Sequence, residues 1–266
     1  MERVSVIIPT YNRENTIKRS IKSVLEQSYS NIELIVVDDA SKDDTMQIVE
    51  SIEDPRIIYI KLDKNVGAAG ARNAGVKNSA SEYIAFNDSD DEWLNDKLLK
   101  QMDYMIKNPD IDLVYCGMEI CEPDKSFTFP NDTVSGELEG YIYKWLLRRN
   151  TIGTPSMLVK KRCFDEIGGF DSALRCLEDW EMAVRFSKEH KIGFVDDALV
   201  RVYSQKGGVS YNIGAYYETR CKMIADNKDQ MVELGIFDEI VIDMFDRAKT
   251  TGVLEQVKTM LMGYLT

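Results

Sequence analysis

Short apolar segments and helical patterns alternate along the first part of the chain. Residues 4–8, 33–37, 57–62 and 83–86 are short, rich in β-forming side chains and bounded by turn-forming residues, so they predict strands. Between them, apolar side chains recur at the three- and four-residue spacing of amphipathic helices. This alternation favours an α/β fold with a mostly parallel sheet and helices on both faces.

After Pro109 the alternation of strand and helix patterns becomes less regular. Further strands are predicted at residues 113–121, 156–159 and 192–203, and helices at residues 136–149, 162–167 and 177–189. Residues 213–266 contain no convincing strand and predict two or three helices, broken near Gly235 and Gly252. We therefore expect an α/β domain at residues 1–212 and a helical C-terminal segment at residues 213–266.

The C-terminal segment carries apolar side chains at helical spacing, which need burial. They can pack against the body of the protein, against a second copy of the chain or at a membrane surface. Self-association as a homo-oligomer is the arrangement that we favour.

An acidic cluster directly follows the fourth predicted strand, in residues 83–93 (YIAFNDSDDEW). Parallel strands gather their carboxyl ends at one edge of a sheet, so Thr10, Asp39 and Asp88 are expected to line one crevice. Carboxylate oxygens fixed there suit Mg²⁺ or Mn²⁺. The alternative is that the acids stabilise the first turn of a helix predicted at residues 94–107, and helix capping is the role we expect for Asp91.

Composition narrows the classes of function. With 33 basic and 45 acidic residues the net charge is −12, which disfavours binding to nucleic acid. An acidic protein that handles phosphates needs a local metal ion or a local basic patch. The five cysteines form no CxxC pair, and no apolar run reaches a membrane span or a signal peptide, so we expect a reducing, cytoplasmic location.

Several familiar sites are excluded by the residues present. The sequence has no GxxxxGK(S/T) phosphate-binding loop, and residues 67–70 (GAAG) lack the GxGxxG spacing of dinucleotide sites. The only histidine, His190, lies in a charged run and is expected at the solvated surface. A single histidine excludes a multi-histidine zinc site and disfavours a Ser-His-Asp triad.

Five short motifs occur in the order found in one enzyme family. They are residues 6–12 (VIIPTYN), 36–41 (VVDDAS), 70–73 (GARN), 87–91 (NDSDD) and 178–180 (EDW). From residue 4 to about residue 210 the chain resembles the family 2 inverting glycosyltransferases. The resemblance implies a Rossmann-like GT-A fold, in which residues 1–110 bind the nucleotide sugar and residues 111–212 bind the acceptor.

The resemblance implies roles for the residues that would bind the donor UDP-sugar. Pro9, Thr10 and Tyr11 would form the floor of the uracil pocket. Asp39 would accept a hydrogen bond from the pyrimidine N–H, a task for a fixed acceptor. Arg72 would meet the diphosphate, which suits a guanidinium. The alternatives are a helix-capping role for Asp39, together with its neighbour in the sequence, and a surface position for Arg72.

The DxD element is expected to hold the metal ion. Asp88 would lie near the ribose, with Ser89 beside it, and Asp88 and Asp90 would bind Mn²⁺ or Mg²⁺. The ion would neutralise the diphosphate and act as Lewis acid for the departing UDP. Many relatives carry a histidine where this chain has Lys206, and the lysine can place a point charge on the diphosphate instead.

The motif at residues 178–180 is expected to serve the acceptor. Inversion by single displacement needs a base that takes the proton of the acceptor hydroxyl, and Asp179 is our candidate. Glu178 and Trp180 would contact the acceptor. The alternatives are that the two acids only stabilise a helix N-terminus and that Trp180 belongs to the core.

We therefore expect a metal-dependent inverting transferase that moves a hexose or N-acetylhexosamine from a UDP-sugar to a hydroxyl of a glycan, a lipid-linked saccharide or a glycoprotein. Two rivals remain: another metal-dependent phosphoryl enzyme, and a non-catalytic nucleotide-sugar-binding or scaffold module. Residues 122–154 and the C-terminal helices are expected to read the acceptor. The Lys144, Arg148 and Arg149 cluster either recruits an anionic acceptor or a membrane surface, or is a solvated helix face.

Overall fold

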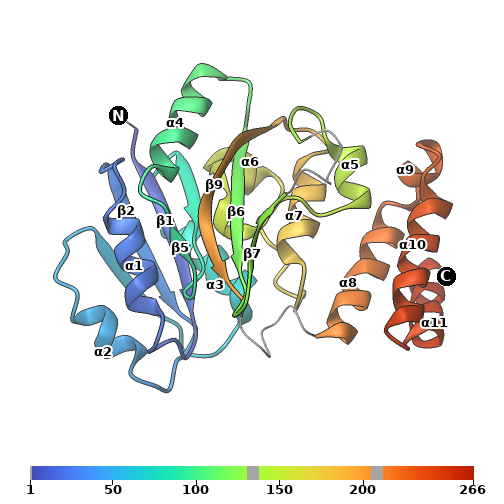
Figure 1. The fold of residues 1–266 in the computed structure, drawn as a ribbon, viewed down its shortest axis with the longest axis horizontal. Coiled ribbons are helices and arrows are strands. Elements are labelled where there is room, and N and C mark those ends of the chain that lie inside the picture. Colours follow the sequence, from blue (N-terminus) through green and yellow to red (C-terminus); the bar gives the residue numbers. More distant parts are fainter. Residues whose placement is uncertain (1, 131–137, 205–211) are drawn as a thin grey trace.

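The computed structural model describes residues 2–130, 138–204 and 212–266 (Figure 1). Nine strands form one sheet in the order β3-β2-β1-β4-β8-β6-β9-β5, and β7 pairs with β6. The first half of this sheet is parallel and consists of β1 (Val4–Thr10), β2 (Ile32–Asp38), β3 (Ile57–Lys61) and β4 (Tyr83–Phe86). The α/β fold and these four strands confirm the interpretation of the apolar segments.

The second half of the sheet is mixed. β8 (Leu158–Lys160) runs antiparallel to β4 and to β6 (Leu113–Cys121), whereas β6 and β9 (Ile192–Tyr203) are parallel. β7 (Ser126–Phe129) returns along β6, and the two-residue strand β5 (Glu92–Trp93) pairs antiparallel with β9. β5 therefore ties the segment after the acidic cluster to the far edge of the sheet.

Helices cover both faces, because successive strand residues point to opposite sides of the sheet. Ile8 of β1 belongs to the core that includes α1 (Ile17–Leu25) and α4 (Lys97–Lys107). Ile7 belongs to the opposite core. That second core includes residues of three further helices, α3 (Gly67–Lys77), α6 (Lys161–Glu166) and α7 (Glu178–Phe186). The remaining short elements before the C-terminal segment are α2 (Thr45–Glu50), α5 (Tyr143–Arg148) and the 3-10 turn η1 (Thr154–Ser156).

Two predicted helices are shorter than their patterns indicate. The helix expected at residues 136–149 is only α5, and residues 131–137 lie outside the described part of the chain. Before α5, Gly140 pairs with Ile192 through two backbone hydrogen bonds, which keeps the chain extended there. The helix expected from residue 94 begins at Lys97, because β5 and a turn precede it.

The C-terminal segment contains four described helices rather than two or three. They are α8 (Ile213–Asp226), α9 (Lys228–Glu233), α10 (Phe237–Thr250) and α11 (Leu254–Leu265). Gly235 and Gly252 adopt positive φ at the two expected breaks. The unexpected break lies at Asn227, whose side chain amide donates to the carbonyl of Met223 and ends α8.

The four C-terminal helices lie at one end of the molecule, beyond α7 (Figure 1). Ile236, Ile240 and Met244 are buried in the same core as Phe186 of α7. Contacts within the chain therefore bury these apolar side chains, and their burial needs no second copy. In the part of the chain that the structure describes, no helix is long and apolar enough to cross a membrane. The division at residue 212 stays a prediction.

Candidate active site

The carboxyl ends of β1, β2 and β4 meet at one edge of the sheet. Thr10 is paired with Asp38, and Ile7 is paired with Phe86. The residues that follow these strands therefore lie side by side, which confirms the expectation that Thr10, Asp39 and Asp88 lie at one sheet edge. This edge is the usual place for a ligand in an open α/β sheet.

The tip of β1 offers an unsatisfied polar group. The hydroxyl of Thr10 is buried and has no hydrogen-bond partner among the described residues. Pro9 lies within β1 beside it, and the ring of Tyr11 is 40% exposed. A buried hydroxyl without a partner costs about 1–3 kcal/mol, so a ligand that supplies a partner is favoured here.

Strained backbone marks three turns around the site. Asn12, Ala40 and Leu177 have φ of 51°, 65° and 61°, and they are the non-glycine residues with positive φ among those described. Each lies next to a predicted site residue. Such conformations cost roughly 1–3 kcal/mol and cluster at functional sites. Sequence patterns did not reveal them, because none of the three is a glycine.

Asp39 anchors the start of α3. Its Oδ1 accepts from the backbone N–H of Val66 at 2.7 Å, and its Oδ2 accepts from that of Gly67 at 2.8 Å. Asp38 instead accepts from the backbone N–H of Ser41 and from the hydroxyl of Tyr59. Each oxygen of Asp39 keeps capacity for another donor. The contact between Asp39 and uracil stays a prediction. The two backbone hydrogen bonds hold the carboxylate in a fixed position, as such a contact requires.

Arg72 joins the two acidic motifs. Its Nη2 donates to Oδ1 of Asp88 at 2.6 Å and its Nη1 to Oε1 of Glu178 at 2.7 Å, across 106 residues of sequence. Arg72 is only 4% exposed, so the surface alternative is wrong. Burial lowers the pKa of its guanidinium, but Asp88 and Glu178 outweigh that effect and raise the pKa, so Arg72 stays charged.

The acidic cluster holds more negative charge than its neighbours neutralise. Burial, and then Asp88, raise the pKa of the Asp90 carboxyl. Burial, and then Asp88 and Asp90, raise the pKa of Asp91 well above its usual value. The carboxylate of Asp90 forms an ion pair with Arg13, whose Nη2 lies 3.5 Å from Oδ2. A hard divalent cation bound here would relieve this repulsion between the carboxylates. Ser89 is buried between them in the chain.

Asp91 does not cap a helix, and that expectation is wrong. β5 follows it directly, and its Oδ1 accepts from the backbone N–H of Tyr203 at 3.2 Å. The acidic cluster is thereby fixed to the end of β9. Arg19 lies over the ring of Tyr203 at 3.9 Å and donates to the carbonyl of Asp90. No sequence signal singled out Arg13 or Arg19. Lys206 lies outside the described residues.

Asp179 lies in the first turn of α7. Its Oδ1 accepts from the backbone N–H of Trp180 at 2.7 Å, and no described residue donates to its other oxygen. Burial, and then the charge of Glu178, raise the pKa of the Asp179 carboxyl to about 7. A carboxylate with this pKa is a stronger base than an ordinary aspartate. Its role as base stays a prediction.

Trp180 is held in the core. It is 5% exposed, and its Nε1 donates to the carbonyl of Leu146 at 2.6 Å. The guanidinium of Arg220 lies 4.1 Å from the centre of its ring. This ring face is therefore covered by a cation. No sequence pattern indicated Arg220, which lies in the segment outside the motifs.

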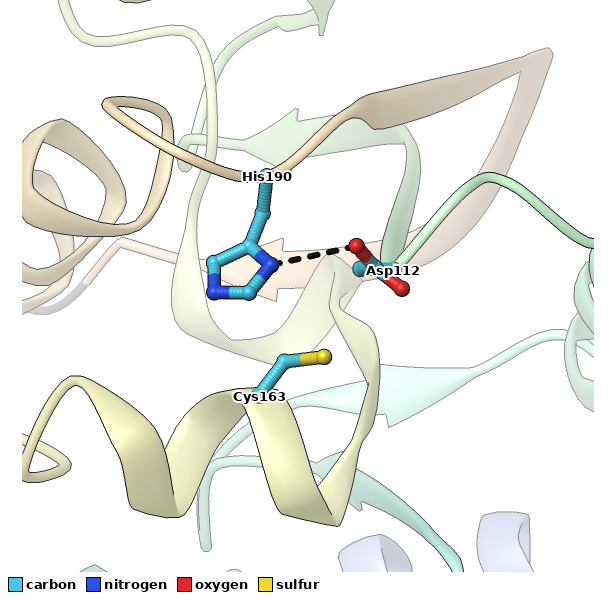
Figure 2. Close-up of side chains that lie close together, drawn as sticks. All are labelled: Asp112, Cys163 and His190. Carbon is cyan, nitrogen blue, oxygen red and sulfur yellow. Dashed lines mark hydrogen bonds and ion pairs between the residues drawn. The ribbon is translucent and has the colours of Figure 1, made fainter.

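His190 is not at the solvated surface, which corrects the expectation from its charged neighbours. Its side chain is 12% exposed, with Nδ1 at 3.1 Å from Oδ2 of Asp112 and the ring packed on Phe186. Figure 2 shows Cys163 directly beside this pair. The ligand atoms of the three residues lie within 4.8 Å of one another. Asp112 is already neutralised by Lys160 at 3.0 Å, which disfavours an additional cation.

Comparison with known proteins identifies the fold and the family. The fold is shared with Staphylococcus aureus TarS in complex with UDP, with a TM-score of 0.66 and 22% identity over 84% of this chain and 64% of that one. It is also shared with the mannosyltransferase PcManGT from Pyrobaculum calidifontis in complex with GDP-Man and Mn²⁺, with a TM-score of 0.66 and 19% identity over 98% of this chain and 74% of that one. This is the GT-A fold of glycosyltransferases. The model of glycosyl transferase family 2 matches residues 5–167, and the chain belongs to this family.

Two curated relatives come from Escherichia coli. The UDP-Glc:alpha-D-GlcNAc-diphosphoundecaprenol beta-1,3-glucosyltransferase WfaP is 50% identical over 105 residues, which are 40% of this chain and 42% of the relative. WfgD, with the same named activity, is 34% identical over 200 residues, 74% of each chain. An uncharacterized glycosyltransferase of Haemophilus influenzae is 31% identical over 70% of this chain and 62% of its own length. The first relative is thus matched over less than half of its length.

Proposed function

We propose that the chain transfers glucose from UDP-glucose to a hydroxyl of a lipid-linked saccharide, with inversion and with Mn²⁺ or Mg²⁺. The observation that carries this proposal is Arg72, which joins the acidic cluster at Asp88 to the first turn of α7 at Glu178. This link supports a single site that would contain both the predicted donor residues and the predicted base. The family, and the activities named for WfaP and WfgD, support the donor and the acceptor class.

Different residues of the chain would bind the donor and activate the acceptor. Asp88 and Asp90 would hold the divalent cation, which supplies charge neutralisation for the diphosphate. Thr10, Tyr11 and Asp39 would bind and orient the uridine. Asp179 would remove the proton of the acceptor hydroxyl as that oxygen attacks the anomeric carbon and UDP leaves. We also propose a cytoplasmic location, which the unpaired state of all five cysteines supports.

The proposal is tested by UDP release from a panel of UDP-sugars with Mn²⁺, with Mg²⁺ and with EDTA. We expect slow, metal-dependent hydrolysis of UDP-glucose that exceeds hydrolysis of UDP-galactose and UDP-N-acetylglucosamine. Asp179→Asn should bind UDP as tightly as the wild type, and Asp196→Asn, an exposed matched control, should change nothing. UDP binding without turnover of donor or acceptor would instead favour the non-catalytic module. Absence of any UDP-sugar binding would overturn the donor assignment.

A further inference from the structure

A cavity lies beside the first turn of α7, the turn that carries the candidate base. Its volume is about 340 Å³, and it lies between α5, α7, α8 and α10, which are neighbours in Figure 1. Leu177 and Trp180, the residues that flank Glu178 and Asp179 in the sequence, line it. The cavity therefore borders the turn of α7 that carries Asp179, although Asp179 itself does not line it.

The lining of this cavity is strongly basic, although the protein as a whole is acidic. Four arginines line it together with one acid, so we call it the arginine cavity: Arg148, Arg149, Arg220, Arg247 and Asp243. Arg148 is paired with Glu239 at 2.8 Å, and Arg247 with Asp243 at 2.9 Å. Arg149 and Arg220 form no ion pair with any described residue. Two positive charges are therefore available to an anion.

The buried side chain of Arg220 has a donor group that is free to bind a ligand. Its side chain is 3% exposed, and its Nη1 has no hydrogen-bond partner among the residues described. Burial lowers the pKa of this guanidinium to about 10, so it is charged at neutral pH. Stacking on Trp180, whose Nε1 is fixed by the carbonyl of Leu146, holds the guanidinium plane in place. A buried charged donor without an acceptor is costly, and an anion would remove that cost.

We propose that the arginine cavity binds the diphosphate that links the acceptor saccharide to its lipid, a subsite that rests on the proposed function. Guanidinium groups bind phosphate oxygens in a bidentate manner and suit this group better than lysine does. The accepting hydroxyl and the anomeric phosphate are on different carbons of one sugar ring, so the groups that bind them would have to lie about one sugar apart. The hydroxyl would lie at Asp179 while the diphosphate meets Arg220. Tyr216 and Tyr217, which also line the cavity, offer rings for the sugar or the first lipid carbons.

The first test compares two soluble acceptors that differ only in the diphosphate: N-acetylglucosamine linked to an alkyl chain through a diphosphate, and the same sugar on the alkyl chain directly. For Arg220→Gln we expect the KM for the diphosphate acceptor to rise about 10- to 100-fold. This factor corresponds to the binding free energy of one hydrogen bond to a charged group. Rates with the neutral acceptor and the KM for UDP-glucose should not change. Arg149→Gln, at an exposed position, should act in the same direction, and Lys144→Gln, on α5 but outside the lining, should have no effect.

Direct binding separates this proposal from the proposed function. The diphosphate acceptor is titrated calorimetrically into the full chain saturated with UDP, so that the donor site is already filled. One outcome is that the acceptor binds to the wild type but not to Arg220→Gln, and that no glucose is transferred. This outcome would support the cavity and overturn the glucosyltransferase assignment. Transfer with equal KM in wild type and both arginine variants would overturn the cavity alone. Competition by phosphatidylglycerol vesicles that carry no saccharide would also overturn it, because a general lipid headgroup site would then explain the arginines.

Discussion

Replacement of the candidate base should make the protein more stable while it removes activity. In Asp179→Asn the amide oxygen can still accept from the backbone N–H of Trp180, so the local geometry is kept. The substitution removes the negative charge of the carboxylate, which burial and the charge of Glu178 both disfavour. A residue selected for stability would behave in the opposite way. The substitution therefore tests whether the first turn of α7 is arranged for chemistry rather than for helix capping.

The size of this effect follows from the raised pKa. A change from 3.8 in the unfolded chain to about 7 in the folded protein is about three units, or roughly 4 kcal/mol at 1.36 kcal/mol per unit. Screening by solvent at this partly buried position reduces it, and we expect about 1–3 kcal/mol. The folded carboxyl holds its proton more tightly, so its cost is absent below pH 4, grows between pH 4 and 7, and is complete above pH 7.

Urea unfolding of wild type and Asp179→Asn at pH 4.5, 6 and 8 measures this cost. The free energy of unfolding of the variant should exceed that of the wild type by an amount that grows with pH. Asp196→Asn should show no pH-dependent difference. Equal stability of Asp179→Asn and wild type at pH 8, or a less stable variant, would refute the reasoning.

Further predictions concern the same site and its surroundings. Arg72→Gln should lower the free energy of unfolding by about 2–4 kcal/mol, because two partly buried carboxylates lose their partner. Lys107→Gln, which breaks an exposed ion pair, should lower it by less than about 0.5 kcal/mol. Equal losses for the two variants in urea unfolding would contradict this prediction. With an acceptor present, kcat/KM should rise with pH through about 7 as Asp179 ionises, and a flat profile would exclude it as the base. Mn²⁺ should raise the Tm of the wild type by several degrees but not that of Asp90→Asn; identical shifts in a thermal melt would place the ion elsewhere. Asp112→Asn should cost about 1–3 kcal/mol at pH 7. The difference should shrink as the pH falls below 3.8, the usual value for aspartate, because the pKa of Asp112 is lowered in the folded protein; a difference that does not change in acid would contradict the ion-pair explanation.

The parallel half of the sheet was predictable because its signals are local. Strand apolarity and the turns that end β1, β2 and β4 follow from neighbours in the sequence, so the common edge of Thr10, Asp39 and Asp88 followed directly. The β5 strand was missed because two residues carry no periodicity, and with it the contact between Asp91 and Tyr203 was missed.

Contacts between distant segments could not be derived from spacing. Nothing in the sequence pairs Arg72 with Glu178 or places His190 against Asp112, because these contacts depend on how α3, α7 and the strands pack. Arg220 illustrates the same limit, since its unsatisfied guanidinium becomes evident only when α8 lies against Trp180. The charged neighbours of His190 indicated exposure, but a hydrogen bond with Asp112 and a ring contact with Phe186 outweighed them.

Transfer of glucose to the diphosphate-linked acceptor tests the central claim most directly. The rate would be measured for wild type, Asp179→Asn and Asp196→Asn with UDP-glucose and Mn²⁺, and the configuration of the product would be assigned by NMR. We predict a β-linked product from wild type and Asp196→Asn, and a rate about 10²–10⁴-fold lower for Asp179→Asn with unchanged UDP binding. An α-linked product, or an Asp179→Asn variant as active as wild type, would contradict the account.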